Sequence, residues 1–140
     1  MWWVRSTWLA LAVLFAACSA KPPQFFQLKA LTSDRVSGGS YVKEETFVVA
    51  NAPQDRSALK LAVEAFDHGT LTEGDVLGRT RYTRWFFRES RALPRDYRGN
   101  AEDWGGNDIN DHLDDLLLEV RFSKGLASAR YTFYEHGVAQ

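Results

Sequence analysis

A single cysteine, Cys18, is present in the 140-residue chain. One thiol can form neither an internal disulfide nor a Cys-x-x-Cys metal site, so the folded part must derive its stability from a hydrophobic core. The sequence also lacks the Gly-x-Ser-x-Gly motif of many hydrolases and the glycine-rich loops that hold nucleotide phosphates. A formal net charge of −1 creates no overall field that would attract nucleic acid. We therefore expect neither a nucleic-acid partner nor a cofactor.

Apolar residues make up 45% of the chain and charged residues 25%. These fractions are typical of a globular domain and unlike those of a disordered chain. The length suits one domain of about 100–150 residues. Composition therefore indicates a single folded unit with its own core.

The first 20 residues have the layout of an export signal. Arg5 supplies a positive charge, and the uncharged segment Trp8–Ala17 follows with ten residues. A helix needs roughly 20 apolar residues to cross a bilayer, so this segment is too short for a span and fits the apolar region of a signal peptide. Small residues then precede the cysteine in the tetrapeptide Phe15–Cys18, Phe-Ala-Ala-Cys.

This tetrapeptide resembles the lipobox of bacterial lipoproteins, although Phe15 stands where leucine is commoner. The resemblance implies a signal peptide over residues 1–17 and a lipid on Cys18. Because Ser19 and not aspartate follows, it also implies the outer membrane, facing the periplasm, in a Gram-negative cell. Each buried acyl CH₂ contributes about 0.8 kcal/mol, so two or three chains would hold the protein to a membrane. The alternatives are a secreted protein that is cut after Ala20 and loses the cysteine, and a chain whose anchor is not cleaved or whose start is misassigned.

After the signal, we expect a lipidated cysteine and a tether over residues 18–36 and a single domain over 37–140. Pro22 and Pro23 favour an extended spacer. A short first strand over residues 25–31 is compatible with this division. The glycine pair in Ser37–Ser40 predicts a flexible turn at the start of the domain.

Local patterns predict the first elements of the domain. β-Forming residues indicate a strand over residues 41–51. An amphipathic helix follows, with Asp55 or Ser57 as its cap and His68-Gly69 at its end. Its apolar residues at positions i, i+3, i+4 and i+7 are Leu59, Ala62, Val63 and Phe66. The polar segment 70–78 contains two glycines and is interpreted as a loop.

The second half of the domain is predicted to be mainly β. A strand over residues 79–91 contains three consecutive aromatic residues, Trp85–Phe87, which indicate a bulge or burial on both faces. After a loop over residues 91–110, alternating residues predict a hairpin of two strands, 116–122 and 127–134. The order β-α-β-β-β predicts an α+β fold, with a mainly antiparallel sheet of about four strands and one amphipathic helix packed on one face.

Charges are segregated along this half of the chain. Residues 79–98 contain seven arginines, whereas residues 99–119 contain seven acids and neither lysine nor arginine. One interpretation is that the two blocks lie on neighbouring strands and face each other. The other is that the basic block forms a recognition surface with an aromatic residue, a composition typical of interface hot spots. The candidate surface residues are Arg84, Arg88, Arg91 and Trp104.

The acidic block also raises the question of a metal. An EF-hand loop that starts at Asp108 would place Leu113 at the glycine position, so that motif is absent. We assign no metal and keep four residues only as candidate ligands of another kind of site: Asp108, Asp111, His112 and Asp115. The alternative is a short helical turn whose acids are solvated.

The sequence thus predicts a lipid-anchored envelope protein that acts as a non-catalytic binding module for a protein or an envelope polymer. An inhibitor-type or immunity-type lipoprotein is one variant. A second hypothesis is a metal-binding or small-ligand-binding lipoprotein that uses the acidic loop 103–115. A hydrolase is the third, and it would require a pocket in which His112 and at least two carboxylates converge.

Overall fold

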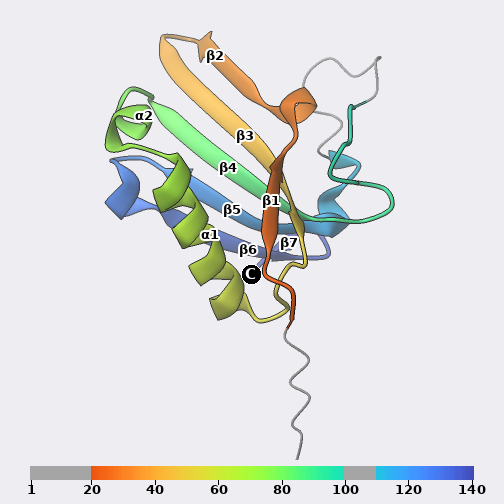
Figure 1. The fold of residues 1–140 in the computed structure, drawn as a ribbon. Coiled ribbons are helices and arrows are strands. Elements are labelled where there is room, and N and C mark those ends of the chain that lie inside the picture. Colours follow the sequence, from red (N-terminus) through yellow and green to blue (C-terminus); the bar gives the residue numbers. More distant parts are fainter. Residues whose placement is uncertain (1–19, 100–109) are drawn as a thin grey trace, which may run out of the picture.

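The computed structural model describes residues 20–99 and 110–140 (Figure 1). Cys18, Trp104 and Asp108 lie outside these ranges. The strands are β1 (Gln24–Gln27), β2 (Ser33–Ser37), β3 (Ser40–Ala50), β4 (Arg81–Arg88), β5 (Leu116–Phe122), β6 (Arg130–Glu135) and β7 (Val138–Ala139). The helices are α1 (Arg56–Thr70) and α2 (Glu73–Leu77), with 3-10 turns η1 (Lys29–Leu31), η2 (Leu113–Asp115) and η3 (Leu126–Ser128).

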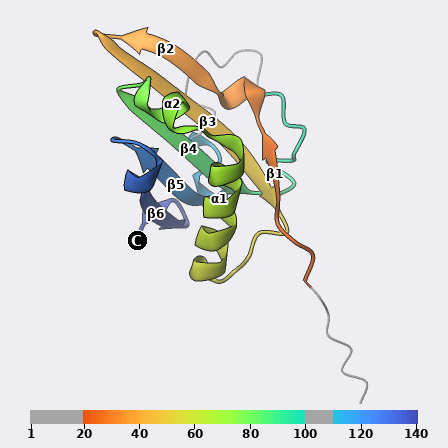
Figure 2. The ribbon, with the colours of Figure 1, turned by 60° about the vertical axis from the view of Figure 1, so that its left-hand side comes forward.

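The strands of the described residues form one seven-stranded mixed sheet in the order β1-β3-β4-β5-β6-β7, with β2 also paired to β3. β1 pairs with the end of β3, where Gln24 lies opposite Ala50, and β2 pairs with its start, where Ser37 lies opposite Ser40. Both strands therefore follow the same edge of β3 (Figure 2). β3 and β4 are parallel, and the chain between them carries both helices, as a parallel crossover requires.

The predicted α+β class is confirmed, but the prediction of about four strands in the order β-α-β-β-β is wrong. β2 and β7 were not predicted, because one is polar and the other has only two residues, so neither has a periodic pattern. The predicted strand 25–31 consists of β1 followed by the turn η1. The sheet thus begins at Gln24, inside the segment that was assigned to the tether.

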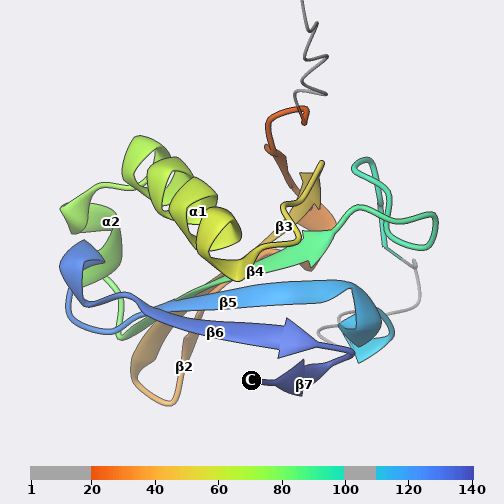
Figure 3. The same ribbon diagram turned by 90° about the horizontal axis from the view of Figure 1, so that it is seen from below.

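Helix α1 forms where the apolar spacing predicts it and lies across one face of the sheet (Figures 1 and 3). Asp55 is its cap, since Oδ1 accepts a hydrogen bond of 2.8 Å from the backbone N–H of Ala58. Leu59 and Val63 are buried against the sheet. The helix ends at Thr70, one residue beyond the predicted end.

A second, short helix replaces the loop predicted over residues 70–78. Thr72 caps α2 in a reciprocal arrangement with Asp75. The Thr72 hydroxyl accepts from the Asp75 N–H at 3.2 Å, and the Asp75 carboxylate accepts from the Thr72 N–H at 2.8 Å. This is a capping box, and buried Val76 attaches the helix to the main core. The prediction of a loop was wrong because the capping box outweighs the low helix propensity of Gly74, while Gly78 is the C-cap at the end of the helix.

The main hydrophobic cluster fills the space between α1 and the sheet. Its centre is a group of four phenylalanine rings from four different elements. Phe25 stacks on Phe66 with ring centres 4.4 Å apart, and Phe47 stacks on Phe86 at 5.4 Å. Offset and edge contacts of this kind add to the free energy gained from burying the rings.

A second cluster lies on the opposite face of the sheet, where Leu28, Val48, Phe87, Leu93 and Leu116 are buried together. Phe86 and Phe87 therefore belong to different clusters, and both are fully buried. The register with β5 also shifts between these two residues. Burial on both faces, one of the two explanations offered for the consecutive aromatic residues, is thus confirmed, and the shift in register is compatible with the other, a bulge.

The C-terminal hairpin is confirmed as two antiparallel neighbours, β5 and β6. The predicted apolar face of the second strand packs against the main cluster through Ala129, Tyr131 and Phe133. The predicted alternation of buried side chains along β5 does not extend to its first residue. Leu116 packs in the second cluster, on the opposite face from Leu118, whereas Leu117 packs in the main cluster.

Replacement of Thr72 by alanine tests the capping box. The substitution removes one helix-terminal hydrogen bond, so the free energy of unfolding should fall by about 1 kcal/mol. Thr72→Ser retains the hydroxyl and should stay within a few tenths of a kcal/mol of wild type. Urea denaturation measures both changes, and equal stabilities of the two variants would contradict the capping role.

Candidate functional site

Arg84, the first residue of the predicted surface, is buried and only 3% exposed. It lies on the α1 side of β4, where Nε donates to Glu45 at 2.9 Å and Nη1 donates to Asp67 at 2.8 Å. Nη1 also lies 2.8 Å from the hydroxyl oxygen of Thr70. The prediction that Arg84 belongs to an exposed surface is therefore wrong, because α1 covers this part of the strand.

The ion pairs of Arg84 belong to a larger buried network. Glu45 also accepts a hydrogen bond of 2.6 Å from the Tyr82 hydroxyl and lies 3.2 Å from the ammonium group of Lys43. The guanidinium of Arg84 lies 5.1 Å from the centre of the Phe47 ring. One cation thus connects a carboxylate of β3 to a carboxylate of α1 and is held between aromatic rings.

The two carboxylates that face Arg84 titrate differently. Burial opposes the ionisation of Glu45, but the Tyr82 hydroxyl and the Arg84 cation outweigh it and hold its pKa below the usual value. Burial raises the pKa of Asp67 to about 6, because the bond to Arg84 offsets the loss of hydration only in part. The second oxygen of Asp67 is buried and accepts no hydrogen bond from the described residues. The network is therefore a structural link between α1 and the sheet, with Asp67 as its least satisfied member.

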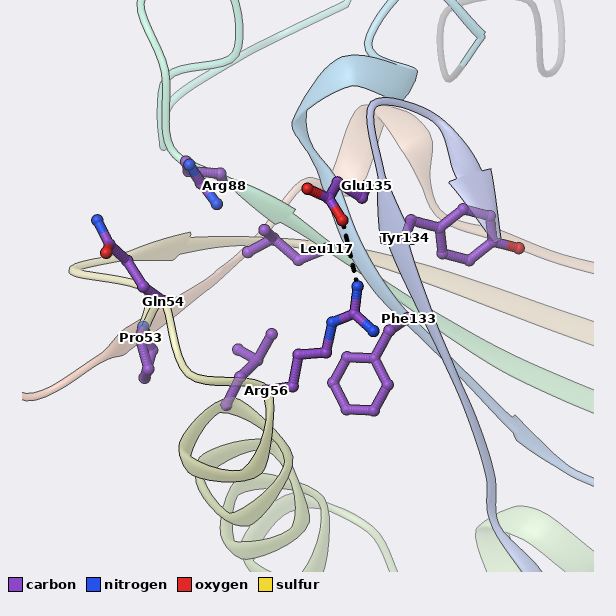
Figure 4. Close-up of a pocket in the computed structure, with 9 residues that line it drawn as sticks. Pro53, Gln54, Arg56, Arg88, Leu117, Phe133, Tyr134 and Glu135 are labelled. Atoms are coloured by element: carbon purple, nitrogen blue, oxygen red, sulfur yellow. Dashed lines mark hydrogen bonds and ion pairs between the residues drawn. The ribbon is translucent and has the colours of Figure 1, made fainter. Parts of the chain in front are cut away.

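An open cleft lies at the other end of α1, between the start of the helix and the ends of β4 and β6 (Figure 4). Its volume is about 180 Å³. The lining residues are Pro53, Gln54, Arg56, Leu59, Arg88, Leu117, Phe133, Tyr134 and Glu135. The charged members are thus two arginines and one glutamate.

Arg56 crosses the cleft from the first turn of α1. Its Nη2 donates to a carboxylate oxygen of Glu135 at 3.3 Å, and its guanidinium carbon lies 5.8 Å from the centre of the Phe133 ring (Figure 4). Both side chains of this ion pair are more than half exposed, so the pair contributes little to stability. The contact can be exchanged for a contact with a ligand at small cost.

Arg88 forms the opposite wall of the cleft as the last residue of β4, and it is exposed. Within residues 20–99 and 110–140, no carboxylate forms an ion pair with it. Arg91, three residues further along the chain, is exposed as well. The structure thus places two of the predicted surface residues near this end of the sheet and removes Arg84, while Trp104 stays a prediction.

Among the described residues, the two charge blocks do not face each other as one interpretation predicted; three of the seven acids lie outside these residues. β4 and β5 are indeed neighbours, but Glu119 lies opposite Trp85 and pairs with Arg121 on its own strand. Four of the seven arginines of the basic block form ion pairs with other described acids. These pairs are Arg79 with Asp34, Arg81 with Glu44, Arg84 with Glu45 and Asp67, and Arg95 with Glu89.

The described metal candidates have other contacts. The ring of His112 packs edge-on against Tyr97 at 5.2 Å, and Asp115 accepts a hydrogen bond of 2.6 Å from the Ser90 hydroxyl. Asp111 is exposed. In the part of the chain that the structure describes, no three His, Cys, Asp or Glu side chains gather as metal ligands would. Neither described cavity contains His112, so the pocket required for the hydrolase hypothesis is not found there.

A second cavity, of about 380 Å³, lies on the sheet face opposite α1 and near the start of β3. Arg35 and Arg81 line it with Ser40, Val42 and Thr80. The cavity was not predicted, although the alternation of β4 alone would have placed Arg81 on the face opposite Arg84. Glu44 forms ion pairs with both arginines of this cavity, at 3.3 Å to Arg35 and 3.5 Å to Arg81. The positive charges of the cavity are therefore already neutralised in part.

Comparisons of the chain with protein-family models, with curated proteins and with solved structures give no match. Among the described helices, none combines the length and apolar character that a membrane span needs.

Replacement of Arg84 by methionine should lower the free energy of unfolding by about 3–5 kcal/mol, because two buried carboxylates lose their shared cation. Arg84→Lys keeps the charge but not the forked geometry of the guanidinium, so we expect its free energy of unfolding to fall by less than that of Arg84→Met. Urea denaturation measures both. A methionine variant as stable as wild type would show that the network does not hold α1 on the sheet.

Asp67 should give the stability of the protein a characteristic pH dependence. Its folded pKa of about 6 exceeds its usual value of 3.8, so the folded state keeps a proton that the unfolded state has lost. The contribution of Asp67 to stability is therefore greatest below about pH 4 and is lost as the pH rises through 6. Relative to Asp67→Asn, the wild type should lose on the order of 2–3 kcal/mol between pH 4 and 7.

Denaturation of wild type, Asp67→Asn and Asp114→Asn at a series of pH values measures this difference. Asp114 is exposed, so its variant controls for the loss of one carboxylate. If the free energy of unfolding changes with pH in the same way for wild type and Asp67→Asn, the pKa of Asp67 is not raised in the folded state.

Proposed function

We propose that this protein is an envelope lipoprotein, anchored through Cys18, whose folded domain is a non-catalytic binding module. The main support is the succession of a positive charge, ten uncharged residues and the small residues before Cys18. This succession is typical of a processed signal and is too short for a membrane span.

The distance from the proposed anchor to the fold also supports this role. β1 begins at Gln24, six residues after Cys18. Six residues extend to at most about 20 Å, so a lipid on Cys18 would keep the domain close to the bilayer surface. A module held in this way meets its ligands at the membrane or immediately beside it.

The cleft supports binding as the task of the domain. Its charged and amide side chains, from Arg56, Arg88, Glu135 and Gln54, are groups that hold a ligand through ion pairs and hydrogen bonds. Its lining contains one carboxylate and neither serine, cysteine nor histidine, so no pair of a nucleophile and its base is present in it. The arginine-rich strand end thus fits recognition better than bond cleavage.

Replacement of Cys18 by serine tests the anchor. The wild-type protein, produced in a bacterium that processes lipoproteins, should fractionate with membranes and carry acyl mass on an amino-terminal cysteine. The Cys18→Ser chain should lack that mass. Mass spectrometry of the mature amino terminus measures the difference, with Ser19→Ala as a control that leaves the cysteine in place. Recovery of the wild type as a soluble chain that begins at Met1 would contradict the proposal.

A further inference from the structure

The start of the folded chain lies beside the cleft. The Asn51 side-chain amide donates to the backbone oxygen of Pro22 at 3.3 Å, and Gln24 pairs with Ala50 at the end of β3. Two residues after Asn51, the chain reaches Pro53 at the lip of the cleft. The segment that leads to Cys18 therefore leaves the fold at the end of the sheet that carries the cleft (Figure 1).

This placement gives the domain an orientation, provided that the proposed anchor at Cys18 exists. The segment between Cys18 and Gln24 extends to at most about 20 Å. β3 has 11 residues, so the second cavity near its start lies about 30 Å further from the tether. The end with the cleft is thus the end that an anchored chain presents to the bilayer.

The charges at this end suit an anionic surface. Arg88 has no ion-pair partner among the described residues, and Arg56 has only the exposed pair with Glu135. Two acids adjoin these arginines in the chain: Asp55 accepts the hydrogen bond that caps α1, and Glu89 pairs with Arg95. Lys21, on the tether itself, adds a third exposed cation. The net charge of the whole chain is close to zero, so this cation excess is local.

We propose that the cleft binds the phosphate group of an anionic lipid in the membrane to which the chain is anchored. Arg88 and Arg56 bind its oxygens from opposite walls, since the planar guanidinium fork matches phosphate geometry. Glu135 releases Arg56 when the lipid enters. A volume of about 180 Å³ accommodates a headgroup phosphate but not a folded protein segment.

Arginine-specific labelling of the full lipidated protein in nanodiscs tests this assignment. Phenylglyoxal modifies accessible guanidinium groups, and mass spectrometry gives the rate at each arginine. The discs contain phosphatidylcholine alone, phosphatidylcholine with phosphatidylglycerol, or phosphatidylcholine with inorganic phosphate in the buffer. Arg88 should react several-fold more slowly with phosphatidylglycerol than with phosphatidylcholine alone, whereas Arg35, at the far end of the sheet, should react at the same rate. Equal labelling rates of Arg88 in all discs overturn the proposal. If inorganic phosphate protects Arg88 and phosphatidylglycerol does not, the cleft does not take its phosphate from a lipid.

Two matched variants distinguish binding of the lipid phosphate in the cleft from non-specific protection of Arg88 by a charged membrane surface. Arg56 and Arg35 are 52% and 50% exposed, and each lies 3.3 Å from a glutamate oxygen. Arg56→Gln should abolish most of the protection of Arg88 by phosphatidylglycerol, and Arg35→Gln should leave it unchanged. Since Arg56 is exposed, circular dichroism should show that its variant is folded. Protection that is unchanged in Arg56→Gln means general screening and overturns the site.

The same labelling with dissolved short-chain phosphatidylglycerol separates this inference from the proposed anchor. Binding of a dissolved lipid does not require a lipid on Cys18. If mass spectrometry finds no acyl group, protection of Arg88 by the dissolved lipid still supports the cleft as a phosphate site. If Cys18 is acylated and Arg88 reacts at one rate with and without the dissolved lipid, the anchor stands and the cleft assignment fails.

Discussion

The contact of Arg84 with two buried carboxylates fixes the position of α1 on the sheet. Glu45 belongs to β3 and Asp67 to α1, and one guanidinium binds both. Removing charges from water costs several kcal/mol per ion, so such a group persists only with good geometry and further hydrogen bonds. Tyr82 and Thr70 supply those bonds. The unpaired oxygen of Asp67 and its raised pKa show that the compensation is incomplete.

The position of α1 in turn creates the cleft. Arg84 lies under the last turns of the helix and is buried, whereas Arg88, four residues along the same strand, lies beside the first turn and is exposed. The helix therefore leaves a space at its start, into which Arg56 and Glu135 project from opposite sides (Figure 4). β1 begins at the same end of the sheet, so the first described residues lie beside the cleft.

Local patterns predicted much of the fold. The apolar spacing of Leu59 and Val63 located α1, and alternation located β5 and β6. β2 was not predicted because it has no buried apolar face: its only large apolar side chain, Val36, is 74% exposed. The strand is held by backbone pairing with β3. Of the two arginines that line the cleft, the sequence pattern predicted Arg88 but not Arg56. An isolated arginine at the start of a helix has no pattern that distinguishes it from any other exposed charge.

The sequence by itself determined the main helix and the strands with a buried periodic face, because these depend on residues close together in the chain. Only the tertiary structure decided the partners of the charges. Arg84 and Arg88 have the same residue type and lie on the same side of β4, yet one is buried in an ion-pair network and the other lines an open cleft. The difference arises from where a helix that starts 28 residues before Arg84 crosses the strand, and distant segments determine that crossing.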